Sequence, residues 1–261
     1  MAGYPRRIIC LTEETTETLY LLGCGDRIVG ISGFTMRPLE ARQQKPKVST
    51  FTEANIEKIV ALKPDLVFAF SDLQAEIVKQ LVSRGRQVMA FNQRSVKEIH
   101  QNIILIGSRV GEQKRAESLV ANYERRIESV ASRMNSRALP KVYFEEWPDP
   151  MISGIRWVSE LVEIAGGKDI FEENRLHHDA KNRIVESREV VKRNPDIIIG
   201  SWCGKPFKKQ MVKNRKGWGS IAAVQQNQLH EIKSAIILQP GPAALTDGLD
   251  ALVRIIDVWR G

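Results

Sequence analysis

Apolar positions along the first hundred residues recur with two alternating periods. Short apolar runs, such as those at Arg7–Leu11 and Leu66–Phe70, predict buried strands. Between such runs, apolar side chains recur three to four residues apart, as at Ile56, Ile59 and Val60, which predicts amphipathic helices. Because strands that alternate with helices pair side by side, this half of the chain is expected to form a parallel α/β sheet.

The pattern changes between Ser95 and Arg137. From Gly111 onward there is no strand signal, and apolar residues return only at helical spacing. One helix over residues 112–135 would extend about 35 Å, since each residue adds about 1.5 Å. We interpret this segment as a rigid connection between two lobes.

The α/β pattern restarts after Pro140. "KVYFE", "DIIIGSW" and "LHEIKS" predict strands, while "WVSELVEIAGG" and the segment that begins at Pro242 predict helices. The stretch "NIEKIVALKPDLVFAF" is echoed by "SREVVKRNPDIIIGSW", which indicates two similar lobes or two α/β units that are alike by chance. The expected organisation is an N-terminal α/β lobe (1–111), a connecting helix (112–137) and a C-terminal α/β lobe (138–261).

Ligands of parallel α/β sheets bind beyond the carboxyl ends of the strands. The residues expected there are largely aromatic or acidic, and they are Glu13, Glu14, Phe34, Phe51, Phe70, Glu146, Trp147, Trp202 and, in "LQPGP", Gln239. Rings that face each other across such an edge suit a large, flat, partly apolar ligand. For Phe70 an ordinary core position is the alternative, whereas Trp147 and Trp202 are expected at the rim.

Composition narrows the class of partner. The net charge is +8, and the basic residues are densest from Lys205 to Trp218, which indicates either a solvated surface or a patch that faces a partner. No nucleic-acid-binding motif accompanies this run, so we expect no nucleic-acid partner. The chain has no apolar stretch of the roughly 20 residues that a membrane span needs. No signal peptide precedes the first strand, so the chain is either cytoplasmic or a mature domain.

The residues that could carry catalysis or hold a metal do not form a recognisable catalytic or metal site. Glu145 and Glu146 are adjacent on a predicted strand, so their side chains point to opposite faces and cannot flank one substrate. The segment His177–Asp179 offers no third, distant metal ligand. The three cysteines are widely spaced, and Cys203 has no histidine placed beside it. We expect no catalytic residue and no metal site, and an enzyme using Glu146 and Cys203 is the least favoured alternative.

Several segments together resemble a known family. "RIICLTEETTETLYLLGCGDRIVGIS", "KVSTFTEANIEKIVALKPDLVFAF" and "SGIRWVSELVEIAGGKDIF" resemble the substrate-binding proteins of ABC importers that have a helical backbone, and most closely the vitamin B12-binding members. The resemblance covers nearly the whole chain. It implies a class III periplasmic-binding-protein fold, with two Rossmann-like lobes joined by one rigid helix, and a non-enzymatic monomer that holds its ligand between the lobes.

The resemblance also implies a ligand and a partner. The ligand would be cobalamin or a related corrinoid, and the partner would be the permease subunits of an ABC importer, outside the cytoplasm. The cleft aromatics of the family fall on Phe34 and Phe51, and the facing loops fall on "EEWPDPMISG" and "GSWCGKPF", with Trp147, Cys203 and Lys205. Family members dock on the permease through one glutamate per lobe, which corresponds here to Glu57 and Glu189.

Two departures leave alternatives open. The position that corresponds in spacing to Glu57 is Arg188, one residue before Glu189, and one residue turns a helical side chain by about 100°. A cytoplasmic corrinoid-binding protein without a transporter is therefore one alternative. The lysines at positions 205, 208 and 209 would instead suit an anionic iron chelate, such as a ferric siderophore, or haem.

Overall fold

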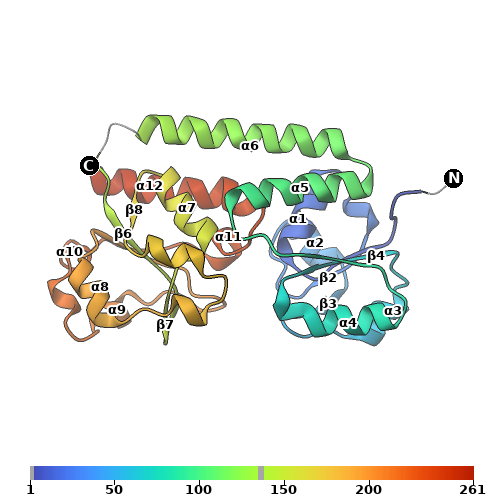
Figure 1. Cartoon of the computed structure of the whole chain (residues 1–261), viewed down its shortest axis with the longest axis horizontal. Helices are drawn as coiled ribbons and strands as arrows, with labels where there is room; N and C mark the ends of the chain where they lie inside the picture. Colours follow the sequence, from blue (N-terminus) through green and yellow to red (C-terminus); the bar gives the residue numbers. More distant parts are fainter. Residues whose placement is uncertain (1–2, 135–137) are drawn as a thin grey trace. The chain divides into compact units, whose positions relative to one another are not determined.

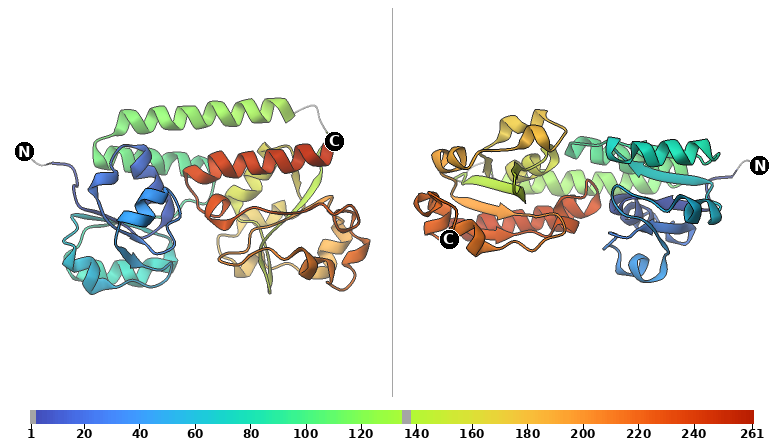
Figure 2. Two further views of the ribbon diagram at one scale, coloured as in Figure 1. Left: turned by 180° about the vertical axis from the view of Figure 1, so that it is seen from behind. Right: turned by 90° about the horizontal axis from the view of Figure 1, so that it is seen from below.

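The computed structural model describes residues 3–134 and 138–261, and the last residues of the predicted connecting helix, 135–137, lie outside the described residues. The chain divides into two compact units. Unit 1 comprises Met1–Gln93 and Lys97–Asn122, and unit 2 comprises Arg94–Val96 and Tyr123–Gly261. Each unit contains one five-stranded sheet with helices on both faces (Figures 1 and 2).

The sheet of unit 1 is entirely parallel, as the sequence predicts. Its strands are β1 (Ile8–Cys10), β2 (Ile28–Ser32), β3 (Lys47–Ser49), β4 (Leu66–Phe70) and β5 (Val88–Phe91), in the order β3-β2-β1-β4-β5. The three-residue strand β3 was not expected, because "VSTFTE" reads as a loop. The helices are α1 (Glu13–Leu21), α2 (Leu39–Gln44), α3 (Ile56–Ala61), α4 (Ala75–Ser83) and α5 (Val96–Val110).

Alternation along the strands of unit 1 separates its two cores. Ile9, Val67 and Ala69 pack against the apolar residues of α3 and α4, including Ile59 and Leu81. Their neighbours in sequence point to the other face, where Figure 1 shows α1. Both faces are covered, which explains why these strands are continuous apolar runs rather than alternating ones.

Helix α6 (Gln113–Met134) confirms the long helix expected from the periodicity. Its 22 residues extend about 33 Å. At its start it packs against α5, where a Cβ at Gly107 would lie only 2.3 Å from the Cβ of Ala116. This close approach requires glycine at position 107. In unit 2, Arg126 of α6 forms an ion pair with Asp250 of the closing helix.

The sheet of unit 2 is mixed, which differs from the purely parallel sheet that was expected. Its strands are β6 (Lys141–Pro148), β7 (Met151–Ser153), β8 (Lys168–Asp169), β9 (Ile197–Gly200) and β10 (Leu229–Glu231). The order is β10-β9-β6-β7, with β8 also paired to β6, and β7 is antiparallel to β6. The helices are α7 (Arg156–Ile164), α8 (Ser187–Arg193), α9 (Lys209–Lys213), α10 (Ala222–Gln225), α11 (Ser234–Ile237) and α12 (Leu249–Arg260).

The expectation that "EEWPDP" forms a loop after the first strand of this unit is wrong. Strand β6 continues through Pro148, and a tight turn at Asp149 and Pro150 leads directly into β7. The pairing of Trp147 with Ile152 and of Pro148 with Met151 gives these residues backbone partners. A two-residue connection between antiparallel strands therefore replaces the expected loop.

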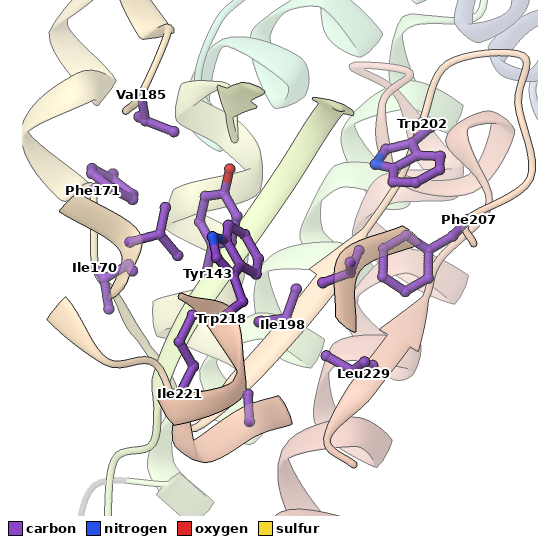
Figure 3. Close-up of a cluster of buried hydrophobic side chains, with 13 residues drawn as sticks. Tyr143, Ile170, Phe171, Val185, Ile198, Trp202, Phe207, Trp218, Ile221 and Leu229 are labelled. Carbon is purple, nitrogen blue, oxygen red and sulfur yellow. The ribbon is translucent and has the colours of Figure 1, made fainter. Parts of the chain in front are cut away.

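The two faces of this sheet also have separate cores. Tyr143, Ile198 and Leu229 pack with residues of α8, α9 and α10, and Figure 3 shows this cluster with Tyr143 and Trp218 at its middle. On the opposite face, Gly167 lies so close to Val142 and Ile256 that a Cβ there would be 2.8 and 3.1 Å from them. Helices α7 and α12 cover that face (Figure 1).

Candidate functional site

The carboxyl edge of the sheet in unit 1 is held together by one buried glutamine. Gln74 donates from Nε2 to the backbone oxygens of Leu11 and Phe51, at 3.3 and 2.9 Å, and accepts the backbone N–H of Phe70 at 3.0 Å. Its side chain is completely buried. It thereby fixes the loops that follow β1, β3 and β4 at one place, which is the edge where the sequence predicts a ligand.

Two phenylalanines of the predicted site lie on loops at this edge of the sheet. Phe34, after β2, is 53% exposed, and Phe51, after β3, is partly buried. The loop of Phe34 is fixed by the backbone N–H of Gly33, which donates to the oxygen of Ser49 at 2.7 Å. Phe70 is only 4% exposed, so its interpretation as a core residue is confirmed. The edge of unit 1 therefore presents one aromatic ring that is about half exposed, Phe34, and one that is partly buried, Phe51.

Two acidic side chains are buried at the same edge, in the first turn of α1. Glu13 is 8% exposed and Glu14 is 3% exposed. Removal from water, together with the negative charge of Glu14, raises the pKa of Glu13 to about 8. Burial likewise raises the pKa of Glu14 to about 7, although the Thr12 hydroxyl donates to its Oε1 at 2.5 Å and opposes the shift. Both carboxyl groups can therefore exchange protons near neutral pH.

The carboxyl end of β6 in unit 2 presents Trp147 beside a lysine. The ammonium group of Lys205 lies 4.2 Å from the centre of the Trp147 ring, and the indole Nε1 donates to the backbone oxygen of Asp149 at 2.9 Å. Trp147 is partly buried and Lys205 is exposed. An ammonium group over an indole face is attracted by the ring quadrupole, so these two predicted site residues form one surface feature.

Trp202 does not lie at an exposed rim, and that expectation is wrong. It is 4% exposed and belongs to the buried cluster of Figure 3, where its ring meets Phe207 at 5.1 Å between centroids. Phe207 in turn covers Gly200, where an added Cβ would lie 1.9 Å from the Phe207 ring. The absence of a side chain at the end of β9 thus admits Phe207, which closes over Trp202.

The indole N–H of Trp202 serves a buried ion pair. Glu145 is fully buried and receives two hydrogen bonds from Arg215, at 2.6 and 2.9 Å, one from Trp202 Nε1 at 2.9 Å, and one from the Tyr143 hydroxyl at 3.1 Å. Four donors compensate the carboxylate for the water it has lost. The sequence does not reveal Arg215 as a structural residue, because it lies within the basic run.

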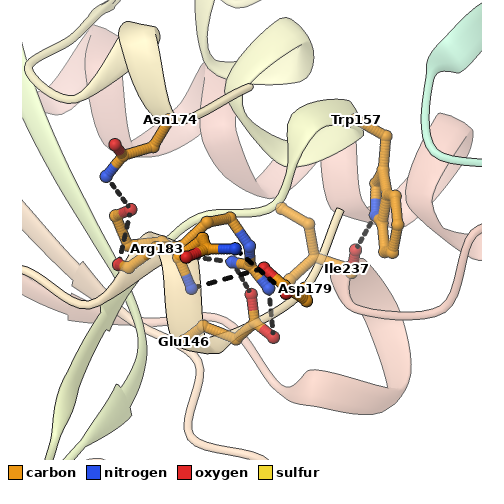
Figure 4. A network of polar contacts seen from close by, with 8 residues as sticks. Glu146, Trp157, Asn174, Asp179, Arg183 and Ile237 are labelled. Atoms are coloured by element: carbon orange, nitrogen blue, oxygen red, sulfur yellow. Dashed lines mark hydrogen bonds and ion pairs between the residues drawn. The ribbon is translucent and has the colours of Figure 1, made fainter. Parts of the chain in front are cut away.

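Glu146 has a separate buried partner. Arg183, which is 2% exposed, donates from Nη1 and Nη2 to the two oxygens of Glu146 at 2.6 and 3.3 Å (Figure 4). Nη1 also donates to the backbone oxygen of Ser153, and the Ser153 hydroxyl donates to the oxygen of Arg183. The two adjacent glutamates therefore have partners on different segments, as expected for neighbours on a strand. Nothing in the local sequence marked Arg183.

The remaining predicted site residues are on separate elements. Cys203 is exposed in the turn after β9. Gln239 is partly buried after α11, and its backbone oxygen accepts the N–H of Gly241 at 2.8 Å. Among the described residues, no three His, Cys, Asp or Glu side chains are grouped so that they could hold a metal ion. Within residues 3–134 and 138–261, no helix has the length and apolar character needed to cross a membrane.

The predicted docking acids lie on helices of the two units. Glu57 of α3 is 79% exposed and pairs with Arg84 at 3.0 Å. Glu189 of α8 is 38% exposed and lies 4.0 Å from Lys192, whereas the neighbouring Arg188 is 80% exposed and pairs with Glu186 at 2.5 Å. A shallow recess of about 270 Å³ beside α8 is lined by Ile184 together with Arg188 and Glu189. Helix α8 of unit 2 thus carries an arginine and a glutamate side by side, where a single glutamate was expected.

Comparisons with known proteins agree with this architecture. The family model described as periplasmic binding protein matches residues 8–236. An uncharacterized ABC transporter substrate-binding lipoprotein of Bacillus subtilis is 30% identical, over 97% of this chain and 80% of its own length. The vitamin B12-binding protein of Vibrio vulnificus is 29% identical, over 92% of this chain and 86% of its own length.

Two solved structures show the same fold at lower identity. A possible iron-binding protein from Staphylococcus epidermidis superimposes with a TM-score of 0.82 at 24% identity, covering 97% of this chain and 99% of its own. The periplasmic heme-binding protein RhuT from a Roseiflexus species superimposes with a TM-score of 0.80 at 21% identity, covering 97% of this chain and 99% of its own. The predicted α/β two-lobe fold is therefore confirmed.

Proposed function

The chain belongs to the periplasmic binding protein family, and we propose that the ligand it binds for its ABC importer is a corrinoid of the cobalamin type. Members of this family are binding proteins without catalytic activity, so the enzyme alternative is set aside. They act outside the cytoplasm, in the periplasm or attached to the membrane as lipoproteins. We propose the same location for this chain.

The observation that carries the corrinoid proposal is the pairing of accessible rings with buried carboxyl groups at the carboxyl edges. Phe34, Phe51 and Trp147 offer flat apolar surfaces, and Glu13 and Glu14 offer hydrogen-bond acceptors. A corrinoid is a large, flat macrocycle with carboxamides around its margin, so it can stack on rings and donate N–H groups to acids. Vitamin B12-binding relatives that match over 92% of the chain support the same ligand class.

Titration with cyanocobalamin, followed by quenching of tryptophan fluorescence, tests this proposal. We expect saturable quenching, and Phe34→Ala should weaken binding about tenfold, because stacking and burial of one ring are lost together. Tyr4→Ala is the matched control, since Tyr4 is an exposed aromatic residue ahead of β1, at the opposite end of the strands. Equal affinities for the two variants, or no quenching at tens of micromolar ligand, would contradict the assignment.

Haem or a ferric chelate is the second candidate, and one feature favours it. Lys205, Lys208 and Lys209 are exposed, and no acidic residue occurs between Asp196 and Glu231. An anionic ligand stacked near Trp147 would meet this positive charge. Titration with hemin and with a ferric siderophore at two salt concentrations separates the candidates, because attraction to exposed lysines weakens as salt screens it. Tight, salt-sensitive hemin binding without cyanocobalamin binding would replace the corrinoid.

Docking on the permease is proposed to involve Glu57 and Glu189. Glu57 is well placed because its exposed pairing with Arg84 contributes little energy, so a partner arginine can replace Arg84. Glu57→Lys should reduce cellular uptake of labelled cyanocobalamin while leaving the affinity of the purified protein unchanged. Glu76→Lys, on the neighbouring helix α4, is the matched charge reversal and should leave uptake intact. Equal uptake by both variants would exclude docking through Glu57.

A further inference from the structure

Glu13 and Glu14 are unusual because two adjacent acids at the start of a helix normally face water. Here both are buried, following β1 at the carboxyl edge of the sheet in unit 1. The backbone N–H of Met36, in the segment after β2, lowers the pKa of the Glu13 carboxyl group and so opposes the effect of burial. Glu14 Oε1 accepts the hydroxyl of Thr12, whereas Glu14 Oε2 is buried and has no hydrogen-bond partner within the described residues.

Two hydroxyl groups at or just beyond the carboxyl ends of the neighbouring strands β2 and β3 also lack partners among the described residues. Thr35, next to Met36, is fully buried, and Ser49 at the end of β3 is 8% exposed. The hydroxyl of each has no partner within the described part of the chain. A buried polar atom without a partner is unfavourable, so partners from outside the chain are expected at such a cluster. With Glu14 Oε2 in the first turn of α1, these are three buried atoms, unsatisfied within residues 3–134 and 138–261, at or just beyond the carboxyl ends of β1, β2 and β3. The three strands are neighbours in the sheet, so the atoms indicate an edge that receives a polar ligand.

The charged groups around the pair leave it short of cations. Glu17, on the next turn of α1, pairs with Arg37 at 2.9 Å and adds negative charge. Arg42 of α2 lowers the pKa of Glu13, but its Nη1 donates to the backbone oxygen of Thr35 at 3.1 Å. Cys10 of β1 is buried, and its pKa is raised to about 12, so the thiol is uncharged. An anionic ligand group would therefore be repelled here once the acids ionise.

We propose that Glu13 and Glu14 form an acceptor subsite that selects neutral N–H donors, such as carboxamides, and releases a proton when it is filled. This deepens the proposed function, on which it rests, by naming the ligand groups that unit 1 recognises. In the free protein one carboxyl group holds a proton near neutral pH. When a ligand N–H approaches, the carboxylate form makes the stronger, charge-assisted bond, and the displaced proton passes to solvent.

Calorimetric titration of the full chain with cyanocobalamin tests the proton release. Measurements at pH 7 in buffers with different ionisation enthalpies give the number of protons released, and we expect about one. Affinity should rise between pH 6 and pH 8, by at most about tenfold per pH unit for one proton. The Glu13→Gln, Glu14→Gln double variant should show no proton release, lose this pH dependence and bind about tenfold more weakly at pH 8.

Control variants separate the subsite from general electrostatics. Glu76→Gln removes one exposed carboxylate from α4 and should leave proton release unchanged. The melting temperature of the double variant without ligand shows whether it has folded. If the wild type binds cyanocobalamin without releasing protons, or if the double variant binds with the same affinity at pH 8, the subsite proposal is overturned.

A second probe keeps the two proposals distinguishable. If the wild type does not bind cyanocobalamin, the corrinoid proposal fails, and hemin then tests the subsite because its carboxylates would meet the same acids. The subsite predicts that hemin binds less tightly as pH rises from 6 to 8, and that the double variant removes this decline. Hemin binding that is independent of pH, or that strengthens as pH rises, would overturn the subsite proposal.

Discussion

Replacement of Arg215 by methionine should destabilise unit 2 more than any loss of surface charge. Arg215 supplies two of the four hydrogen bonds to the fully buried Glu145, at 2.6 and 2.9 Å. Methionine keeps much of the apolar stem but leaves the carboxylate with only Trp202 and Tyr143 as donors. Removing one member of a buried ion pair typically costs about 3–5 kcal/mol of unfolding free energy.

The lower end of that range is expected for Arg215→Met, because two neutral donors remain on Glu145. The guanidinium of Arg215 also lies 4.5 Å from the centre of the Trp218 ring, and this attraction is lost as well. A loss of about 3 kcal/mol corresponds to a fall in melting temperature of about 6–12 °C for a protein of this size. Thermal unfolding followed by far-ultraviolet circular dichroism measures it.

Matched variants show whether the buried pair is the cause. Lys216→Met removes the adjacent exposed cation and should change the unfolding free energy by no more than about 0.5 kcal/mol. Combining Glu145→Gln with Arg215→Met removes both charges, so the double variant should be more stable than the sum of the two single losses predicts. A fall of less than 2 °C for Arg215→Met, or strictly additive losses in the double variant, would refute this explanation.

Three further outcomes are expected. Trp202→Ala should cost about 3–5 kcal/mol of unfolding free energy, because a buried ring and the donor to Glu145 are both lost. Trp147→Ala should instead lower ligand affinity and leave the melting temperature nearly unchanged. Comparable melting temperatures for the two variants would contradict the different positions of these rings. The folded-state pKa values of Glu13 and Glu14, about 8 and about 7, lie above the unfolded value near 4.5, so the folded protein binds more protons in this window. Its unfolding free energy should therefore fall by several kcal/mol between about pH 4.5 and pH 8. Urea unfolding at pH 5 and pH 8 measures this, and an equal decline in the Glu13→Gln, Glu14→Gln variant would assign it to other groups. Gly200→Ala should lower the melting temperature, because the new Cβ would lie 1.9 Å from the ring of Phe207. Gly204→Ala is the comparison variant: its Cβ would meet no atom within 4 Å, but its φ of +69° strains the backbone, so it tests strain without a steric clash.

The order of helices and strands could be predicted from local periodicity, because the spacing of apolar residues within an element reflects which of its faces are buried. The apolar runs at Leu66–Phe70 and Ile197–Gly200 are strands, and the helical spacing after Gly111 continues to Met134. A strand covered on both faces must be apolar throughout, and an amphipathic helix must repeat every three to four residues. Both patterns involve residues that are close together in the chain, so they can be recognised in the sequence alone.

The surroundings of individual site residues depend instead on partners that are distant in the chain. Glu145 and Glu146 are adjacent and look alike in sequence, yet one binds Arg215 and the other binds Arg183, which lie 70 and 37 residues away. The pattern predicts that they point to opposite faces, but it does not say which arginine each will meet. That choice depends on where two elements pack against β6: η4 (Lys181–Arg183), which ends with Arg183, and the segment after α9, which carries Arg215.

Trp147 and Trp202 show the same division. Both follow apolar strand residues, so the local pattern assigns both to a rim. Trp202 is instead buried, because Gly200 has no side chain and so leaves room for Phe207 to pack over the sheet and cover the indole. Trp147 remains accessible because β6 extends past the sheet core into the hairpin with β7. The sequence by itself determined the elements and the edges at which they end, whereas long-range packing alone decided which of the aromatic and acidic side chains at those edges remain free to meet a ligand.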